Sequence, residues 1–292
     1  MSKPADAEPV VLGFRAFDPH ELLLHFVAER LGHYKRMGLA VSLKDITFIP
    51  EDKLESHVFS AACGATLLGR AQGACRKVVF VTTERPMFWL YAHAGVTDLE
   101  QLRGARIATF PPASPLWLLH RAILSRHDLD PDRDVRLEAA RDDVARLGLL
   151  RSGNVEAAVL SSLVPPARAQ SLGLATVLFF GDEIQVPSTG LAVSEEVLRE
   201  RPALVRRMAE AFRHSLASVH ESSRDVLPVL EQLLDATPEI AASTCEIMRA
   251  CFTRDGRASA QGRRNAVELV SEGDSETANR VRDVYDESFL PD

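Results

Sequence analysis

The first two thirds of the sequence alternate between short apolar runs and segments whose apolar residues recur every three or four positions. Val10 to Phe14 is an apolar run, and the segment Pro19 to Arg36 that follows it carries Leu23 and Val27 at helical spacing. The pattern repeats as far as Thr189 to Val193. Strands that alternate with helices form βα units, so the sequence predicts an α/β protein with mostly parallel sheets.

The same reading along the whole chain gives a set of expected elements. Strands are expected at residues 10–14, 39–49, 78–82, 88–93, 106–109, 135–138, 157–160, 175–180 and 189–193. Helices are expected at residues 19–36, 60–73, 98–103, 114–126, 142–151 and 165–171. From residue 195 the pattern is almost entirely helical, at 202–220, 222–234, 238–251 and a final charged stretch, with breaks at Pro202, Pro228, Pro238 and the turn 254–256. The predicted fold is α/β with a helical C-terminal region.

Charge and motif content restrict the partners. Lys and Arg number 34 against 41 Asp and Glu, a formal net charge of −7, which is the opposite of a nucleic-acid-binding surface. The four cysteines form no C-x-x-C pair and have no histidine at metal-ligand spacing. Glycine-rich phosphate loops, nucleophile elbows and metalloprotease motifs are missing from the sequence. We therefore expect no nucleic-acid partner, no metal and no cofactor.

The N-terminal residues place acids and prolines where the apolar core of a secretion signal would lie. No uncharged apolar run reaches the roughly 18 residues that a membrane helix needs. We expect a chain that does not span a membrane and that is periplasmic if a leader was removed, and cytoplasmic otherwise.

The segments that follow the expected strands are the first place to look for a ligand site, because ligands of open parallel sheets bind beyond the carboxyl ends of the strands. These segments are Arg15–His20, Thr82–Arg85, Phe110–Leu116, Ser161–Leu163 and Gly181–Thr189. They are rich in proline and small polar residues.

Three of these positions have both a functional and a purely structural interpretation. Ser114 followed by Pro115 is typical of a helix start, whose free N–H groups attract an anion, although plain capping explains the pair better. Cys63 lies among tiny side chains near a helix start, but no histidine is placed to act as its base, so small-residue packing is favoured over a nucleophile there. Arg85 and Trp89 suit a carboxylate or an aromatic ligand; the alternative pairs Arg85 with Glu84 or an aspartate and buries Trp89.

Six collinear stretches between residues 10 and 220 resemble one known family. They are AERLGHYKRMGLAVSL at 28–43, GACRKVVFV at 73–81, GVTDLEQLRGARIA at 95–108, LGLLRSGNVEAAVL at 147–160, PSTGLAVSEEVL at 187–198 and RPALVRRM at 201–208. The resemblance is to the solute-binding proteins of ABC importers, in the group that takes nitrate, sulfonates, taurine and the pyrimidine precursors of thiamine.

The resemblance implies a type II periplasmic-binding-protein fold with two α/β lobes. Residues 1–94 and 188–292 would form one lobe and residues 95–187 the other, with the ligand held between them and an ABC permease as a partner. Two departures stand out. The stretch 51–57 is shorter than in the family, and no leader is visible. The cysteine-rich motif of the yeast-type pyrimidine synthases on this fold is missing, so their activity is not carried over.

The first hypothesis is therefore a protein that binds a small organic solute, anionic or aromatic, as the substrate-binding component of an ABC importer. Phe17 would form an apolar wall, Arg85 would supply positive charge, and the N–H groups of Ala62 and Leu116 would donate hydrogen bonds. The other expected contacts are Asp18, Ser60, Ala61, Thr83, Ser114, Ser161 and Ser188.

Two other hypotheses remain open. The second is a cytoplasmic lyase or decarboxylase on the same fold, acting on a small aromatic acid, with Asp18, Glu84 or Cys63 as acid or base. The third is a sensor domain that passes ligand binding to a partner protein.

Overall fold

The structure, a computed structural model, describes residues 7–112 and 114–291, which fall into two compact units. Unit 1 comprises Met1–Glu84 and Val186–Asp292, and unit 2 comprises Arg85–Gln185. The chain was predicted to change lobe near residues 94 and 188. The structure instead assigns residues 85–94 to unit 2, because the strand Phe88–His93 pairs with two strands of that unit.

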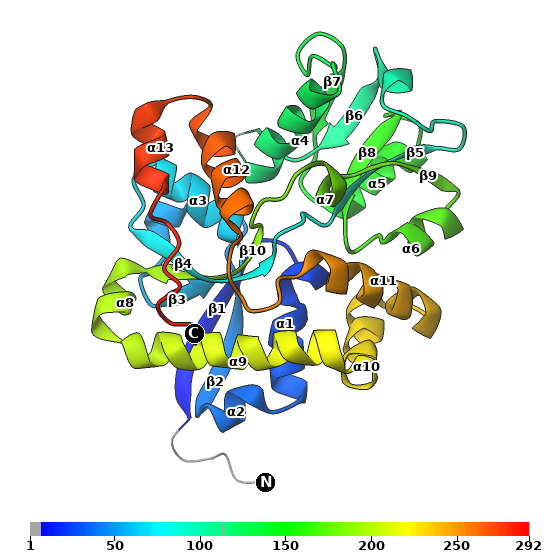
Figure 1. The fold of residues 1–292 in the computed structure, drawn as a ribbon. Coiled ribbons are helices and arrows are strands. Elements are labelled where there is room, and N and C mark those ends of the chain that lie inside the picture. The colour runs from blue at the N-terminus through cyan, green and yellow to red at the C-terminus, as the bar shows by residue number, and fades with distance from the viewer. Residues whose placement is uncertain (1–6, 113, 292) are drawn as a thin grey trace. The chain divides into compact units, whose positions relative to one another are not determined.

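Unit 1 is built on a five-stranded sheet, sheet A, with the order β2-β1-β3-β10-β4 (Figure 1). Its strands are β1 (Glu8–Phe14), β2 (Leu39–Asp45), β3 (Val58–Ser60), β4 (Arg76–Thr83) and β10 (Thr189–Ser194). β10 runs antiparallel to both neighbours, and the other four strands share one direction. The first half of the chain thus forms the parallel strands, and β10 is inserted among them in reverse.

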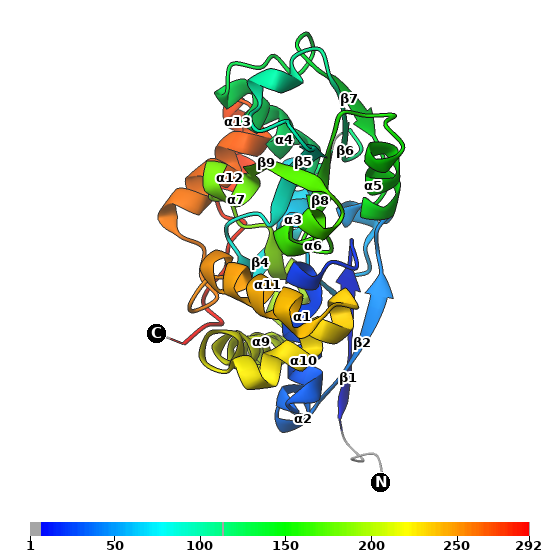
Figure 2. The same ribbon diagram turned by 90° about the vertical axis from the view of Figure 1, so that its right-hand side faces the viewer.

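Ten helical segments belong to unit 1 within the described residues. They are α1 (Pro19–Arg30), α2 (His33–Arg36), η1 (Glu51–Lys53), α3 (Cys63–Ala71), α8 (Glu195–Glu200), α9 (Pro202–Glu221), α10 (Ser223–Leu234), α11 (Pro238–Cys251), α12 (Ala260–Ser271) and α13 (Ser275–Val281). α1 packs on α9, α10 and sheet A, and α11 extends this group (Figure 2). α3 packs on β4 and β10 and contacts α12 and α13.

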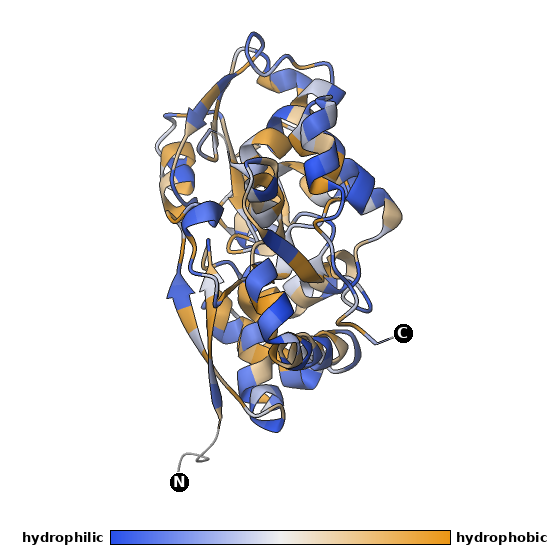
Figure 3. Cartoon of the chain, turned by 90° about the vertical axis from the view of Figure 1, so that its left-hand side faces the viewer, coloured by the Kyte–Doolittle hydropathy of each residue, from blue (hydrophilic) through white to orange (hydrophobic). Residues whose placement is uncertain are grey.

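Apolar spacing explains why these helices pack as they do. In α9, Leu204, Met208, Phe212 and Leu216 are buried and recur every four residues, which gives the helix one continuous apolar stripe. Hydrophilic and hydrophobic residues are mixed along the helices of the chain (Figure 3). The helical C-terminal region therefore contributes one face of each helix to the core of unit 1.

Unit 2 repeats the architecture with sheet B, in the order β7-β6-β8-β5-β9. Its strands are β5 (Phe88–His93), β6 (Arg106–Thr109), β7 (Arg136–Ala139), β8 (Ala157–Ser161) and β9 (Leu174–Phe179). Its helices are η2 (Glu100–Leu102), α4 (Pro115–Arg126), α5 (Asp143–Arg151), α6 (Pro166–Ser171) and α7 (Phe180–Glu183). Here β5 is the reversed strand. The sheets are thus mixed, each with four strands in one direction and one reversed.

Several predicted boundaries were wrong for identifiable reasons. The helix expected over 19–36 is divided at Gly32, whose φ of +71° is left-handed. Pro228, expected as a break, lies inside α10, because the packing of α10 on α1 and α11 outweighs the loss of one backbone hydrogen bond. The strand β3 was missed because three residues are too few to show a period.

The C-terminal segment covers one edge of sheet A, a pairing that was not predicted. Val78 of β4 donates its N–H to the carbonyl of Val284, and Asp286 donates to the carbonyl of Val78, both at 2.8 Å. Tyr285 thereby forms a parallel bridge with Val78. β4 is an edge strand, and this pairing satisfies part of its outer edge.

We predict that Gly190→Ala destabilises unit 1. A methyl group at Gly190 would overlap the carbonyl oxygen of Phe80 and lie 2.9 Å from Sγ of Cys63. Since backbone atoms cannot move aside cheaply, we expect the free energy of unfolding in urea to fall by about 1–3 kcal/mol. Gly148→Ala is the control, because nothing lies within 4 Å of that position in α5. It should leave stability equal or raise it by up to about 1 kcal/mol. Equal stability of the two variants would contradict the close approach of β10 and β4.

Candidate ligand-binding site

The carboxyl edge of sheet A gathers most of the predicted unit 1 residues. Because β10 is reversed, its amino end lies at the same edge as the carboxyl ends of β3 and β4. Ser188 donates its N–H to the carbonyl of Thr83 at 2.9 Å, and the hydroxyls of Thr189 and Thr83 are 2.7 Å apart. Gly190 donates to the carbonyl of Ala61 at 2.8 Å. Thr83, Ser188 and the segment 60–62 thus lie together.

The β1–α1 loop lies at the same edge and is fixed by hydrogen bonds to α1 and to the loop after β2. Arg15 donates its N–H to the Glu21 carboxylate at 2.8 Å, and Thr47 donates its hydroxyl to the Arg15 carbonyl at 2.8 Å. Phe17 in this loop is 52% exposed, and Asp18 is the N-cap residue of α1 without a side-chain capping bond. Both predicted residues therefore stand at the edge of the sheet.

Two buried acids anchor this loop, and the sequence analysis did not single out either of them. Burial, and to a smaller extent the charge of Asp18, raises the pKa of Glu21 to about 8, against the opposing N–H groups of Arg15 and Ala16. Glu51 in η1 pairs with Arg15 at 2.7 Å and with Arg76 at 3.1 Å. The only sequence signal for Glu21 was an acid in the first turn of a helix, which is common at helix starts.

The N-terminus of α3 completes this edge. Its N-cap residue is Ala62, which has no side chain that can accept a hydrogen bond from the first helical turn. Cys63 follows, fully buried, with Sγ 3.6 Å from the carbonyl oxygen of Phe80. Burial raises the pKa of the Cys63 thiol, and the charges of Glu21 and Glu51 raise it further. The thiol is therefore protonated at neutral pH and suits packing rather than nucleophilic attack.

At the carboxyl edge of sheet B, Ser161 belongs to a buried network. Its N–H and its hydroxyl both donate to Oδ2 of Asp143, at 3.0 and 2.5 Å. Asp143 also forms an ion pair with Arg146, whose Nε donates to the carbonyl of Val159 at 2.7 Å. The network ties the start of α5 to the end of β8.

The start of α4 matches the capping interpretation. Ser114 accepts a hydrogen bond from the N–H of Trp117 at 3.2 Å and donates its hydroxyl to the carbonyl of Pro111 at 2.8 Å. Pro115 is the first helical residue and has no N–H, so Leu116 supplies the first N–H of the helix.

Arg85 begins unit 2 and is engaged within it. Its Nε donates to the carbonyl of Gly181 at 2.8 Å, its Nη2 pairs with Asp182, and its guanidinium lies 5.9 Å from the centre of the Phe179 ring. Trp89 is buried and stacks on Phe179 at 4.8 Å. The pairing with an aspartate and the burial of Trp89 are what the structural interpretation expected. The Arg85 side chain is still 35% exposed.

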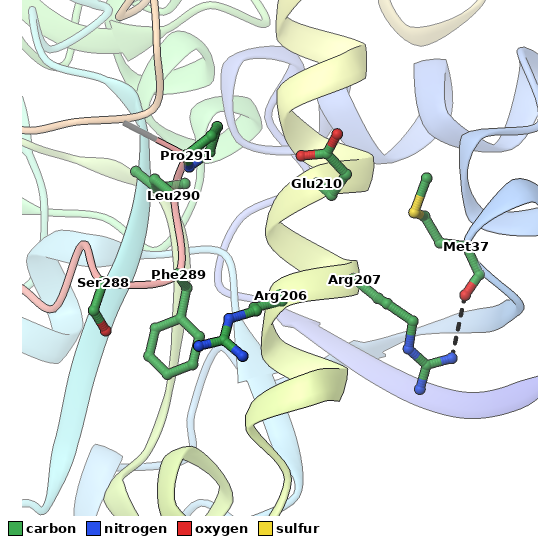
Figure 4. Close-up of a pocket in the computed structure, with 8 residues that line it drawn as sticks. All are labelled: Met37, Arg206, Arg207, Glu210, Ser288, Phe289, Leu290 and Pro291. Atoms are coloured by element: carbon green, nitrogen blue, oxygen red, sulfur yellow. Dashed lines mark hydrogen bonds between the residues drawn. The ribbon is translucent and has the colours of Figure 1, made fainter.

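Elsewhere in unit 1 a surface pocket of about 380 Å³ lies between α9, the end of α2 and the C-terminal segment (Figure 4). Arg206 stacks over the Phe289 ring at 5.7 Å, and Arg207 donates to the carbonyl of Met37 at 3.2 Å. None of the predicted contact residues lines it.

Within residues 7–112 and 114–291, no group of three or more His, Cys, Asp or Glu side chains is placed to hold a metal ion. In the same part of the chain no helix is long and apolar enough to cross a bilayer.

We predict that Asp143→Ala strongly destabilises unit 2, because it leaves the Arg146 guanidinium buried without its carboxylate. The expected loss in free energy of unfolding is about 3 kcal/mol, measured by urea denaturation. Asp132→Ala is the matched control, since Asp132 pairs with Arg121 at the surface at 2.6 Å. Its unfolding midpoint should stay that of the parent protein. A parental midpoint for Asp143→Ala would show that the network is not needed for folding.

The sequence profile of the NMT1/THI5-like family matches residues 21–224, more than half of the chain. The chain therefore belongs to this family, as the resemblance of its six stretches predicted. A search of curated proteins found no match to the sequence.

Three solved structures share the fold across nearly the whole chain. A protein of Bordetella bronchiseptica RB50 has a TM-score of 0.77 at 16% identity, covering 96% of this chain and 95% of that one. The alkanesulfonate-binding protein SsuA from Xanthomonas axonopodis pv. citri, bound to MOPS, has a TM-score of 0.72 at 15% identity, with 97% of each chain covered. The desulfurization enzyme DSZB has a TM-score of 0.63 at 15% identity, covering 93% of this chain and 91% of that one. These likenesses confirm the predicted α/β periplasmic-binding-protein fold.

Proposed function

We propose that the protein binds a small organic solute, anionic or aromatic, and releases it unchanged, with contacts at the carboxyl edge of sheet A. The observation that carries the proposal is the edge of sheet A, where Ser60–Ala62, Thr83 and Ser188 lie beside the start of α3. Ala62 caps none of the N–H groups of this start, and the Gly64 N–H donates to the Ser188 carbonyl at 3.2 Å. The remaining N–H groups of a helix N-terminus, together with hydroxyls from neighbouring strands, suit an anionic group. Membership of the family and the sulfonate-binding neighbour support the same proposal.

In unit 2 the same role falls to Leu116, Arg85 and Ser161. The Leu116 N–H lies in the first turn of α4, next to the N-cap residue Ser114, and Arg85 supplies the positive charge. Arg85 already forms an ion pair with Asp182. To bind an anionic ligand, its guanidinium must therefore either contact both anions or leave Asp182 for the ligand. Ser161 would act through its hydroxyl oxygen, since its proton is donated to Asp143.

We propose further that the protein is the solute-binding component of an ABC importer, with a permease as partner and with the periplasm as its compartment. The support is the periplasmic aliphatic sulphonate-binding protein SsuA from Escherichia coli, which shares the fold at 15% identity.

The groups named for a lyase or decarboxylase have structural roles in unit 1, so we do not propose that activity. Glu84 accepts the N–H of Ser259 at 2.5 Å, next to the start of α12. Cys63 carries a thiol whose pKa burial raises. Asp18 is the N-cap residue of α1.

Native mass spectrometry of the purified protein against a panel of sulfonates, carboxylates and pyrimidines tests the proposal. We expect a one-to-one complex with at least one anionic compound and recovery of that compound chemically unchanged after incubation. Turnover of the compound would refute simple binding, and the lack of any complex would refute the proposed solute class.

For the anion found in this way, we predict that Arg85→Ala weakens binding at least tenfold, or by about 1.4 kcal/mol, in isothermal titration calorimetry. Arg121→Ala is the control, because Arg121 forms a comparable arginine–aspartate pair in unit 2 that follows no strand end. Unchanged affinity of Arg85→Ala would remove Arg85 from the site.

A further inference from the structure

Phe17 is a large aromatic side chain that the structure keeps exposed and at the same time holds in a fixed orientation. It is 52% exposed, yet its ring meets Phe14 edge-to-face at 5.7 Å and Phe26 at 6.0 Å. Phe26 is in turn braced by the His25 ring at 4.9 Å. An exposed ring in such contacts presents one face in a set direction, unlike a side chain that is free to rotate.

The backbone that carries Phe17 is fixed as well. The Glu21 carboxylate accepts the N–H of Arg15, and the Thr47 hydroxyl donates to the Arg15 carbonyl. The Ile46 N–H donates to the carbonyl of Phe14 at 2.9 Å. The loop is thus tied to both α1 and the β2 loop, so the ring needs little ordering when it meets a ligand. Preorganisation of this kind lowers the entropic cost of binding.

Unit 2 places a ring at the corresponding position of its own sheet. β1 and β6 occupy the same place in the orders β2-β1-β3 and β7-β6-β8, with parallel neighbours on both sides. Phe110 follows β6 directly, meets Phe88 edge-to-face at 5.3 Å and has the Arg146 guanidinium 4.1 Å from its centre. Each unit therefore has an aromatic ring in fixed contacts after its equivalent strand, but Phe110 is buried, and only Phe17 presents its ring at the surface.

We propose that the solute is an aromatic acid, a ring that carries a sulfonate or carboxylate group, and that Phe17 is the residue that selects it over short aliphatic acids. The inference rests on the proposed function and specifies its ligand. An oriented phenyl ring gains from edge-to-face or offset stacking with another ring beyond the area that it buries, and a short alkyl chain offers no such partner. The N–H groups at the start of α3 that do not bond to the Ser188 carbonyl, and the hydroxyls beside them, would take the acid group of the same molecule.

The test compares benzenesulfonate with ethanesulfonate, and benzoate with propionate, by isothermal titration calorimetry on the full chain. Each pair shares its acid group and differs in the body of the molecule. We expect each aromatic member to bind at least about tenfold more tightly than its aliphatic partner. If none of the four compounds binds, the proposed anion site fails. If the aliphatic members bind as tightly or more tightly, the anion site stands and the aromatic selection is overturned.

Variants of Phe17 test whether this ring causes the preference for aromatic acids. Phe17→Ala should lower the affinity for benzenesulfonate about fivefold and change that for ethanesulfonate less than twofold, while Phe17→Trp keeps the aromatic preference. Phe17→Leu, which retains apolar bulk without a ring, should behave as Phe17→Ala does, and this guards against a simple loss of packing. An equal loss for both sulfonates would show that Phe17 supports the loop and does not select the ligand.

Phe48→Ala is the matched control. Phe48 is 76% exposed in the loop after β2, which is bonded to the Phe17 loop but follows the outermost strand of sheet A. Its ring lacks the edge-to-face contacts that orient Phe17 within the described residues. We expect parental affinity for all four compounds. A loss of aromatic preference in Phe48→Ala equal to that in Phe17→Ala would contradict the assignment to Phe17.

Discussion

The reversed strand β10 is the constraint on which unit 1 depends. It runs between β3 and β4, and Gly190 allows its backbone to approach Phe80 so closely that no side chain fits there. Because the strand is reversed, Ser188 and Thr189 arrive at the carboxyl edge of the sheet and bond to Thr83. A parallel strand in the same place would bring its opposite end to that edge. The candidate site in unit 1 therefore combines residues that are far apart in the chain, such as Thr83 and Ser188.

The polar groups near the two edges divide into those that support the structure and those that remain for a ligand. Asp143 holds Ser161 and Arg146, and Glu51 holds Arg15 and Arg76. Such buried charges require partners, since an unpaired charge in the interior is costly. The edges offer helix N–H groups, hydroxyls that already bond within the protein, as Thr83 does to Thr189, and the exposed ring of Phe17.

The fold of the chain is compatible with this set of groups but does not by itself decide whether they bind or react. The fold is shared with an alkanesulfonate-binding protein and also with a desulfurization enzyme, so fold alone does not separate binding from catalysis. The distinction rests on particular groups. The Cys63 thiol is buried with a raised pKa, and the Glu84 carboxylate accepts the Ser259 N–H beside the start of α12. Both groups are therefore engaged within unit 1, which favours a structural role for them over acid–base or nucleophilic chemistry.

The sequence by itself determined the class of the fold, most of the elements and the loops that matter. Alternating periods and cap residues such as Ser114 act over a few positions, so they can be recognised without knowing what packs on them. It did not determine the reversed direction of β5 and β10, the three-residue strand β3 or the pairing of the C-terminal segment with β4, because these depend on contacts between distant segments. The same reason explains the site. The sequence indicated that Arg85 and Ser161 follow strands, but only tertiary structure decided that Asp182 and Asp143 would bond to them, and that Phe14 and Phe26 would orient Phe17.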